Sequence, residues 1–329
     1  MKNSSKRNKN INTEYDPNTK NNKKPLIITV LLILIILITF ISFYPSLSNG
    51  FTNWDDTEYV TENPVIFNLN IENIKNIFDF TNEESYRTNI LVKSLYVPLT
   101  MLSFAVDHHF FKFNPFGYHL TNLILHLFNT IFVFWFIYLL RKNIFMAFFV
   151  SLLFGIHPMH VESVAWITER KDVLYSFFFL LSLISYVYYV RKNHIILLII
   201  TFILFTLSLL SKPMAITLPV LLILIDFYEK RKFEKKTIFE KIPFFILSFI
   251  EVLISFKISS IYKTVKDSDV QRSFFYGVGL AGYGFLFYIK KMFAPVNLSP
   301  IYPHTAQIKT FSNLPLFFKL SPAISAGII

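Results

Sequence analysis

Two adjacent carboxylates stand near the start of the sequence, among aromatic and polar residues: Phe51-Thr-Asn-Trp-Asp-Asp-Thr-Glu-Tyr59. Adjacent carboxylates raise each other's proton affinity and attract cations, so Asp55 and Asp56 suit a general base or a divalent-cation site. A solvated acidic loop is the alternative, because Asp, Asn and Thr commonly form such loops. We take Asp55 and Asp56 as candidate catalytic residues and Trp54 as a candidate substrate contact.

A second group of residues is basic and consists of Arg170, Lys171 and Lys212. Arg binds phosphate oxygens as a fork, and Lys acts as a point charge. Pro213 at the first position of a helix would leave free amide groups behind Lys212, which also favours an anion. These residues are therefore candidate phosphate ligands. The alternatives are snorkelling to headgroups and ion pairs with nearby acids, which are Glu162, Glu169 and Asp172.

Four polar residues recur at spacings of three, four and three within an apolar stretch: His119, Asn122, His126 and Asn129. At about 100° per residue they occupy one helical arc of roughly 80°. Such a stripe faces protein or a water-filled cavity rather than lipid. Hydrogen bonds between helices and the lining of a substrate cavity both explain it, and the sequence leaves both open.

The apolar run at residues 144–157 is short for a membrane span and is followed at once by Pro158. As a helix it would cover about 21 Å, well under the ~30 Å hydrocarbon core. The segment His157-Pro-Met-His-Val-Glu162 should then lie below the outer membrane surface, in a cavity. It lacks the His-Glu-x-x-His pattern of zinc proteases, so we expect no metal site. The candidate cavity residues are Trp54, His119, Asn122, His126, His157, His160, Glu162, Asp172, Tyr302 and His304.

The composition indicates that these residues are positioned by membrane helices. The chain has 329 residues, enough for two soluble domains, but it is 53% hydrophobic and only 16% charged, which is typical of a membrane protein. No cysteine is present, which excludes a disulfide scaffold. Lys and Arg outnumber Asp and Glu by 32 to 21, but they fall in short clusters between apolar runs, so we expect the lipid bilayer and not nucleic acid as partner.

Seven apolar runs predict seven transmembrane helices, at residues 26–44, 118–140, 144–157, 173–190, 195–210, 213–228 and 242–262. Basic connections stay on the cytoplasmic side of a membrane. One membrane topology keeps all three basic connections on the cytoplasmic side: Arg141 and Lys142, Arg191 and Lys192, and the cluster at 230–236. It places residues 1–24 inside as a disordered cytoplasmic tail. Outside it places residues 46–117, 158–172, 211–212 and a later loop at 263–313.

Two stretches admit other readings. Residues 95–111 are apolar enough to cross, but crossing would invert every later span, so we expect them to lie at the outer interface. Residues 273–292 either cross or form an amphipathic outer helix. The sequence ends within an apolar stretch at residues 314–329, which predicts that the membrane domain of residues 25–329 is the front part of a longer protein.

Several strings, in this order, resemble one known family: Asn53-Trp-Asp-Asp56, Asn63-Pro64, Tyr96-Val-Pro-Leu-Thr100, Asn114-Pro-Phe-Gly-Tyr-His-Leu-Thr-Asn122 with His126, His157-Pro-Met-His-Val-Glu-Ser-Val-Ala-Trp166, Glu169-Arg-Lys-Asp-Val-Leu174, Ser211-Lys-Pro-Met-Ala215 and Pro295-Val-Asn-Leu-Ser-Pro-Ile-Tyr-Pro303. The family is that of the multispanning O-mannosyltransferases whose membrane part precedes tetratricopeptide repeats, with their bacterial relatives. The resemblance implies an all-α polytopic membrane protein of the C-type glycosyltransferase fold, with about seven transmembrane helices and outer interfacial helices.

The resemblance also implies a function. Its elements are a single mannose-like sugar on a polyprenyl phosphate as donor, an acceptor hydroxyl on the outer face, such as Ser or Thr of a protein, and inversion at the anomeric carbon. The base would be an acidic residue of the first outer loop, which maps onto Asp55 or Asp56. We expect no cofactor, because the leaving phosphate is already charged, although a divalent cation at Asp55 and Asp56 stays open.

Two other classes of protein compete with a glycosyltransferase. A transporter or flippase of a lipid-linked or anionic substrate would also carry charged groups in short, interrupted spans, but it should show a repeated half. The sequence shows no internal repeat and has only eight glycines. A purely structural membrane anchor would leave Asp55, His157 and Arg170 without a purpose.

The charge contrast generates a topology prediction. Residues 46–93 carry eight acids and three bases, whereas residues 229–241 carry six bases and three acids. The chain has no cysteine of its own, so introduced cysteines report single sites. We expect a membrane-impermeant maleimide on intact cells to label Asn70→Cys and to spare Lys235→Cys. Labelling at 235 without labelling at 70 would contradict this topology.

Overall fold

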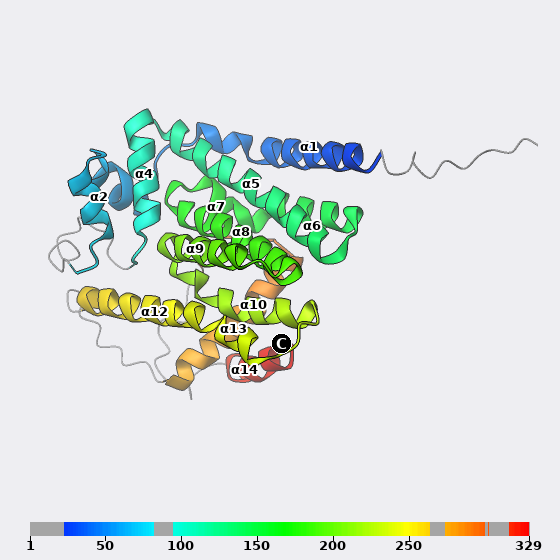
Figure 1. Ribbon diagram of the computed structural model, residues 1–329. Helices are drawn as coiled ribbons and strands as arrows, with labels where there is room; N and C mark the ends of the chain where they lie inside the picture. The colour runs from blue at the N-terminus through cyan, green and yellow to red at the C-terminus, as the bar shows by residue number, and fades with distance from the viewer. Residues whose placement is uncertain (1–22, 82–94, 264–273, 300–301, 303–315, 329) are drawn as a thin grey trace, which may run out of the picture.

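The computed structural model describes residues 23–81, 95–263, 274–299, 302 and 316–328. Every regular element in these ranges is helical, and no strand occurs in them. The protein is an all-α protein of the membrane type, as the sequence predicted (Figure 1).

Each of the seven apolar runs forms a helix: α1 (Lys23–Phe43), α5 (Pro115–Arg141), α6 (Ile144–Ile156), α8 (Arg170–Lys192), α9 (Ile195–Ser211), α10 (Leu218–Tyr228) and α12 (Ile242–Lys263). In the described ranges, three stretches are single helices long and apolar enough to cross a membrane: Lys24–Ser48, Pro115–Arg141 and Ile167–Lys192. A fourth span results if α6 and the next turn, Pro158–Ala165, count as one helix bent by 47°. The number of seven spans therefore stays a prediction.

The three basic connections meet at one end of the helix bundle. Arg141, at the end of α5, lies 3.5 Å from the hydroxyl of Tyr228 at the end of α10. Arg191, near the end of α8, donates to the carbonyl of Leu139 (2.8 Å) and pairs with Glu229 (2.7 Å). All three connections therefore lie at the same end of the bundle, and the side of a membrane on which they lie stays a prediction. Consecutive helices accordingly run back and forth between two ends (Figure 1).

Helix α5 packs between α1, α6 and α8, and small side chains allow this close packing. A Cβ atom on Gly155 of α6 would lie 2.4 Å from Oγ1 of Thr39 in α1 and 2.9 Å from Cγ2 of Thr130 in α5. Only glycine fits at this crossing. Without a hydrophobic drive between helices in lipid, such close backbone approaches stabilise helix association.

The first predicted outer loop folds against the opposite end of the bundle. It contains the helical turns Tyr44–Ser48, Thr57–Thr61 and Pro64–Ile66 and the helices α2 (Ile71–Phe78) and α4 (Pro98–Phe111). Helix α4 has 14 residues, about 21 Å, too short to cross alone. Its Met101 and Phe104 lie in an apolar cluster with Tyr59 of the loop. Residues 95–111 therefore pack with the first predicted outer loop, and their place at the outer interface stays a prediction.

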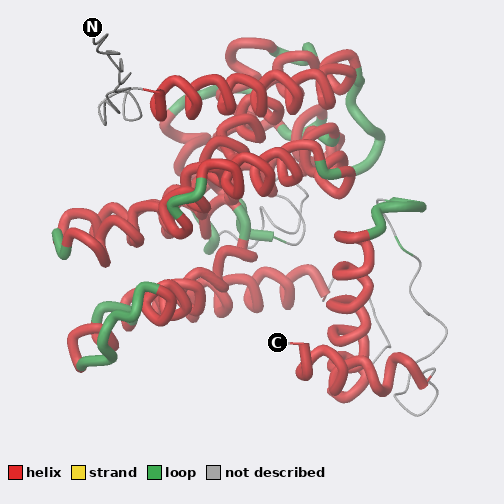
Figure 2. The backbone as a smooth tube through the Cα atoms, turned by 90° about the vertical axis from the view of Figure 1, so that its right-hand side faces the viewer, coloured by secondary structure: helices red, strands yellow, loops and turns green. Residues whose placement is uncertain are grey.

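Short helical turns replace a long helix between α6 and α8: η4 (Pro158–His160), α7 (Val161–Ala165) and η5 (Ile167–Glu169). The predicted later loop contains α13 (Phe274–Phe293), which packs on α14 (Leu316–Ile328) through hydrogen bonds from Ser321 to Gly279 and from Ser325 to Gly282, both 3.1 Å. Figure 2 shows α13 set steeply across the direction of the other helices. Residues 1–22, most of the remaining loop and the candidate residue His304 lie outside the described residues.

Candidate active site

Asp56 is fully buried, and its carboxylate holds the first outer loop in place. One oxygen accepts from the backbone N–H (2.8 Å) and the hydroxyl (3.0 Å) of Thr52, and the other accepts from the N–H of Thr168 in η5 (3.1 Å). A carboxylate with both oxygens engaged and no exposed surface cannot reach an acceptor hydroxyl. The structure therefore gives Asp56 a positioning role, unlike the catalytic role left open by the sequence.

Asp55 differs from its neighbour in exposure and in partners. Its side chain is 41% exposed, and its only ion-pair partner in the described part of the chain is Lys171, with Nζ 3.6 Å from Oδ2. Adjacent residues point their side chains in different directions, so the two carboxylates do not share a site. Of the two adjacent aspartates, Asp55 is the one whose carboxylate is exposed to solvent.

The two candidate lysines lie in an alternating chain of charges. Lys171 contacts Glu169 (3.2 Å), Glu169 contacts Lys212 (3.6 Å), and Lys212 pairs closely with Asp172. Three acids, Asp55 included, therefore face two lysines. The ion-pair reading is the one that the structure supports, and a donor phosphate would have to compete with these carboxylates.

Tyr59 lies beneath the lysine end of this chain of charges. The Nζ of Lys171 is 5.0 Å from the centre of the Tyr59 ring, and the ring is 3% exposed. Burial raises the pKa of the Tyr59 hydroxyl far above its ordinary value, and the negative charges of Asp55 and Glu169 add to this. Tyr59 is therefore a neutral ring that supports Lys171, and it cannot serve as an acid or base near neutral pH.

Arg170 has no exposed surface, which corrects its assignment as a phosphate ligand. Its guanidinium pairs with Asp107 of α4 (2.5 Å) and donates to the side-chain oxygen of Asn122 (2.6 Å) and to the carbonyl of Tyr118 (2.7 Å), both in α5. It also stacks on Phe104, 4.9 Å from the ring centre. Because its donors are used inside the protein, Arg170 joins α4, α5 and α8 and does not reach a bound phosphate.

The polar stripe of α5 is also inside the protein. Asn122 donates to the carbonyls of Trp166 (3.1 Å) and Ile167 (3.3 Å), and Asn129 donates to Val173 (2.8 Å). His126 lies 2.9 Å from the carbonyl of Gly155. His119, Asn122, His126 and Asn129 are each at most 1% exposed. The structure thus favours hydrogen bonding inside the protein over the cavity-lining role assigned to Asn122 and His126, and it buries His119 without placing it in the cavity.

The histidines of the turn after α6 have packing roles. His157 donates from Nε2 to the carbonyl of Met292 (2.9 Å), because its Nδ1 accepts from the N–H of Met159 (3.2 Å). This contact ties α13 to the turn. His160 packs between Phe154, with ring centres 4.5 Å apart, and His126, at 5.5 Å. In the described residues no three His, Asp or Glu side chains are grouped so as to hold a metal ion.

A cavity of about 550 Å³ opens between the first outer loop, the turn at 158–166 and α13. The sequence placed residues 157–162 in a cavity, and Pro158, Met159, Val161 and Glu162 line this one. Trp54 stacks on Trp166 across one wall, with ring centres 5.8 Å apart. Its aromatic, acidic and basic lining side chains are Trp54, Glu162, Trp166, Tyr288, Lys291 and Tyr302. Of the cavity residues predicted from sequence, Trp54, Glu162 and Tyr302 thus line it.

Lys291 is the single cation among the residues that line this cavity. Its Nζ contacts the carbonyls of Val296 and Asn297 (3.0 Å for the latter) and lies 5.4 Å from the ring centres of Phe287 and Tyr302. These contacts neutralise no charge, because carbonyls and rings are uncharged. Lys291 therefore keeps an unneutralised positive charge beside an apolar, aromatic cavity, and the carbonyl and ring contacts hold its ammonium group in place.

Sequence reasoning missed four residues of the site. Trp166 and Glu169 stood in the strings that carried the family resemblance, but Trp166 was assigned no role and Glu169 only that of a possible ion-pair partner. Asp107 is an acid in an otherwise apolar segment, a signal that a buried partner exists. Lys291 was assigned no site role, because nothing in the sequence shows which cavity a residue at the end of a helix lines.

Comparison with known proteins gives consistent relatives. The chain is 38% identical to the protein O-mannosyl-transferase TMTC1 of Mus musculus over 116 residues, 34% of this chain and 11% of that protein. It is 42% identical to TMTC2 of Homo sapiens over 92 residues, 28% of this chain and 11% of that protein. With the protein O-mannosyl-transferase F38B6.6 of Caenorhabditis elegans it shares 28% identity over 269 residues, 79% of this chain and 37% of that protein.

The nematode match runs through most of the chain, at 28% identity. The chain is similar in sequence to the TMTC-type protein O-mannosyl-transferases. It spans 11% of the mouse and human relatives and 37% of the nematode one. No family model matches the chain, and no solved structure matches it.

The buried position of Arg170 generates a stability prediction. Arg170→Gln leaves Asp107 buried without its partner, which typically costs about 3–5 kcal/mol. We expect a clearly lower thermal unfolding midpoint in detergent, whereas Arg141→Gln, at an exposed arginine, should change it little. An unchanged midpoint for Arg170→Gln, together with lost donor binding, would contradict the structural role and restore the phosphate role.

Proposed function

We propose that this chain is the membrane part of a glycosyltransferase that moves a single mannose-like sugar from a polyprenyl phosphate to a hydroxyl, such as Ser or Thr of a protein, on the outer face of the membrane. The observation that carries the proposal is an exposed carboxylate, Asp55, directly beside an aromatic residue, Trp54, that lines the cavity with a held cation. The printed names of the TMTC relatives, protein O-mannosyl-transferases, support the sugar and the protein acceptor.

The cavity supplies surfaces that suit a lipid-linked sugar. Trp54, Trp166, Tyr288 and Tyr302 offer large apolar faces with a polar edge, which fit a ring that is apolar on its faces and polar at its rim. The volume of about 550 Å³ lies within the range of small-ligand sites, enough for a sugar phosphate with the first part of its lipid. The rest of the prenyl chain would lie in the bilayer.

Asp55 is the proposed general base. It takes the proton of the acceptor hydroxyl while the acceptor oxygen attacks the anomeric carbon from the face opposite the phosphate, and this inverts the configuration. Lys171 keeps the Asp55 carboxylate in place at 3.6 Å. The bond between the anomeric carbon and the phosphate oxygen breaks, and the electron pair leaves with the lipid phosphate.

Lys291 is the proposed partner of the leaving phosphate. A cation placed in advance stabilises the charge that develops on the leaving oxygen, and it does so more strongly in a cavity of low polarity than in water. We propose a step without a metal cofactor, since the leaving group is already anionic and Lys291 supplies the counter-charge. This moves the phosphate contact from Arg170, Lys171 and Lys212 to a residue of α13.

We also propose a multi-pass protein with its N-terminus in the cytoplasm. The alternating helices and the shared end of the three basic connections support this orientation. Asp55 and the cavity then lie at the opposite end, where the acceptor would be met.

Removal of the base should separate catalysis from folding. We expect Asp55→Asn to keep the shape of the loop and to lower sugar transfer by about 10² to 10⁴-fold, with donor binding nearly unchanged. Glu62→Gln is the matched control, an exposed carboxylate of the same loop, and should keep near wild-type transfer. Asp56→Asn should lower the unfolding midpoint, because it weakens the bonds to Thr52 and Thr168. Wild-type transfer by folded Asp55→Asn would exclude Asp55 as the base.

Removal of the Lys291 charge should weaken binding of the lipid-linked sugar donor. We expect Lys291→Gln to raise KM for the lipid-linked sugar by about 5 to 150-fold, the range for losing a charge-assisted hydrogen bond. Lys290→Gln removes the same charge from the exposed neighbouring residue and should leave KM unchanged. If Lys291→Gln and Lys290→Gln had equal KM values for the lipid-linked sugar, the donor phosphate would not bind at Lys291.

A further inference from the structure

The opposite end of the bundle carries a second, smaller cavity that the proposed reaction does not use. It has a volume of about 260 Å³ and lies between the end of α8 and the segment that joins α10 to α12, including α11 (Lys235–Phe239). Its lining residues include Asn193, Arg231, Lys232, Lys236 and Thr237. Of the seven lining residues, three are basic and one, Glu234, is acidic.

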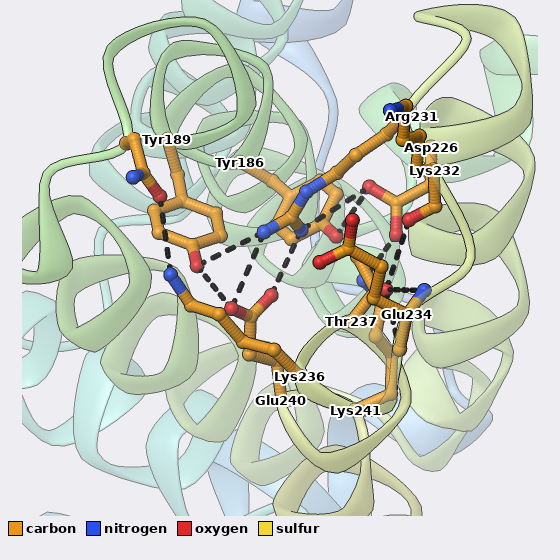
Figure 3. A network of polar contacts seen from close by, with 11 residues as sticks. Tyr186, Tyr189, Asp226, Arg231, Lys232, Glu234, Lys236, Thr237, Glu240 and Lys241 are labelled. Atoms are coloured by element: carbon orange, nitrogen blue, oxygen red, sulfur yellow. Dashed lines mark hydrogen bonds and ion pairs between the residues drawn. The ribbon is translucent and has the colours of Figure 1, made fainter.

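A balanced network of ion pairs forms one side of this cavity (Figure 3). Arg231 makes two hydrogen bonds to Glu240 (2.8 and 3.2 Å), and Lys241 pairs closely with Asp226. The hydroxyl of Tyr189 donates to Glu240 (2.5 Å). Although burial opposes it, the hydrogen bonds from Arg231 and Tyr189 hold the pKa of Glu240 below its usual value, so Glu240 stays charged and neutralises Arg231.

The acids near this cavity already have partners. Asp226 pairs with Lys241, Glu240 with Arg231, and Glu229 with Arg191 (2.7 Å). Glu234 accepts from the backbone N–H of Thr237 in a capping box at the start of α11. Three of these four acids are thus neutralised by basic side chains, whereas Glu234, which lines the cavity, keeps its negative charge.

Two lysines of the cavity have no such counter-charge. Lys236 lies 3.5 Å from the side-chain oxygen of Asn193, a neutral group. Lys232 forms no ion pair with any described residue, and both lysines are exposed. Two exposed, unneutralised ammonium groups beside one cavity favour an anion of the phosphate class.

The side chains that flank these lysines indicate where that phosphate comes from. Phe233 is 61% exposed, Ile238 58% and Phe239 65%, and all three lie in the same short segment as the lysines. Alternating basic and large apolar side chains at the end of apolar helices are typical of the boundary between headgroups and acyl chains. A free soluble anion would not require these apolar neighbours.

We propose that this cavity binds the headgroup phosphate of an anionic phospholipid, with Lys232 and Lys236 on the phosphate and Phe233, Ile238 and Phe239 against the upper acyl chain. The cavity of about 260 Å³ is too small for a whole lipid and suits a headgroup. The bound lipid links the end of α8 to the α10–α12 connection. It thereby stabilises the end of the bundle opposite Asp55, independently of the transfer reaction.

Lipid-dependent thermal stability tests the proposal on the full-length protein in detergent. We expect phosphatidylglycerol to raise the unfolding midpoint by about 2–5 °C at saturation, and phosphatidylcholine at equal concentration to raise it much less. Lys232→Gln/Lys236→Gln should lose the difference between the two lipids. Lys230→Gln/Lys235→Gln removes the same charge from the same segment outside the cavity lining and should keep it.

Three outcomes would overturn the proposal. Equal loss in both double variants would mean attraction to net charge alone. An equal rise with inorganic phosphate would assign the cavity to a soluble anion. Should the cavity variant fail to fold, native mass spectrometry of the wild type still decides, because a specific site retains phosphatidylglycerol in preference to phosphatidylcholine, and equal retention contradicts it.

Discussion

The buried ion pair between Arg170 and Asp107 is the interaction on which the outer end of the molecule depends. It joins α4, which carries Asp107, to α8, which begins at Arg170, and the same guanidinium reaches α5 through Asn122. A buried charge without its partner is costly, so these three helices must keep one arrangement. Lys171 and Asp172 follow directly along α8, and the turn with Glu169 precedes it. The positions of the charged side chains near Asp55, those of Glu169, Lys171 and Asp172, therefore depend on how Arg170 is held.

This constraint separates neighbouring residues into different roles. Asp56 and Arg170 are fully buried and fix the loop and the helices, while Asp55 keeps an exposed side chain and pairs with Lys171. The identities of the two aspartates are the same, and burial alone distinguishes them. The phosphate cation then comes from a different place in the chain, Lys291 of α13, which His157 holds beside the turn through Met292.

Much of the fold could be predicted because apolar runs of about twenty residues become helices whatever their neighbours are. The stripe on α5 predicted burial, but its period could not show that Asn122 serves Arg170 and the backbone of η5. The positive charge of Arg170 predicted an anion beside it, and the sequence analysis took that anion to be a phosphate. The anion is the carboxylate of Asp107, which is distant in sequence, so no local pattern could identify it. The lining of the cavity by Lys291 depends on where α13 packs, which no local pattern contains.

The central claim is that the cavity beside Trp54 is the donor site, with Lys291 on the phosphate and Asp55 on the acceptor side. A structure of the full-length protein with a non-transferable polyprenyl-phosphonate sugar tests it most directly. The account predicts the phosphonate within hydrogen-bond distance of Lys291 Nζ, and the sugar against Trp54 and Trp166 with its anomeric carbon open toward Asp55. A phosphonate bound at Lys212 or Arg170, or a donor held elsewhere with this cavity empty, would contradict it.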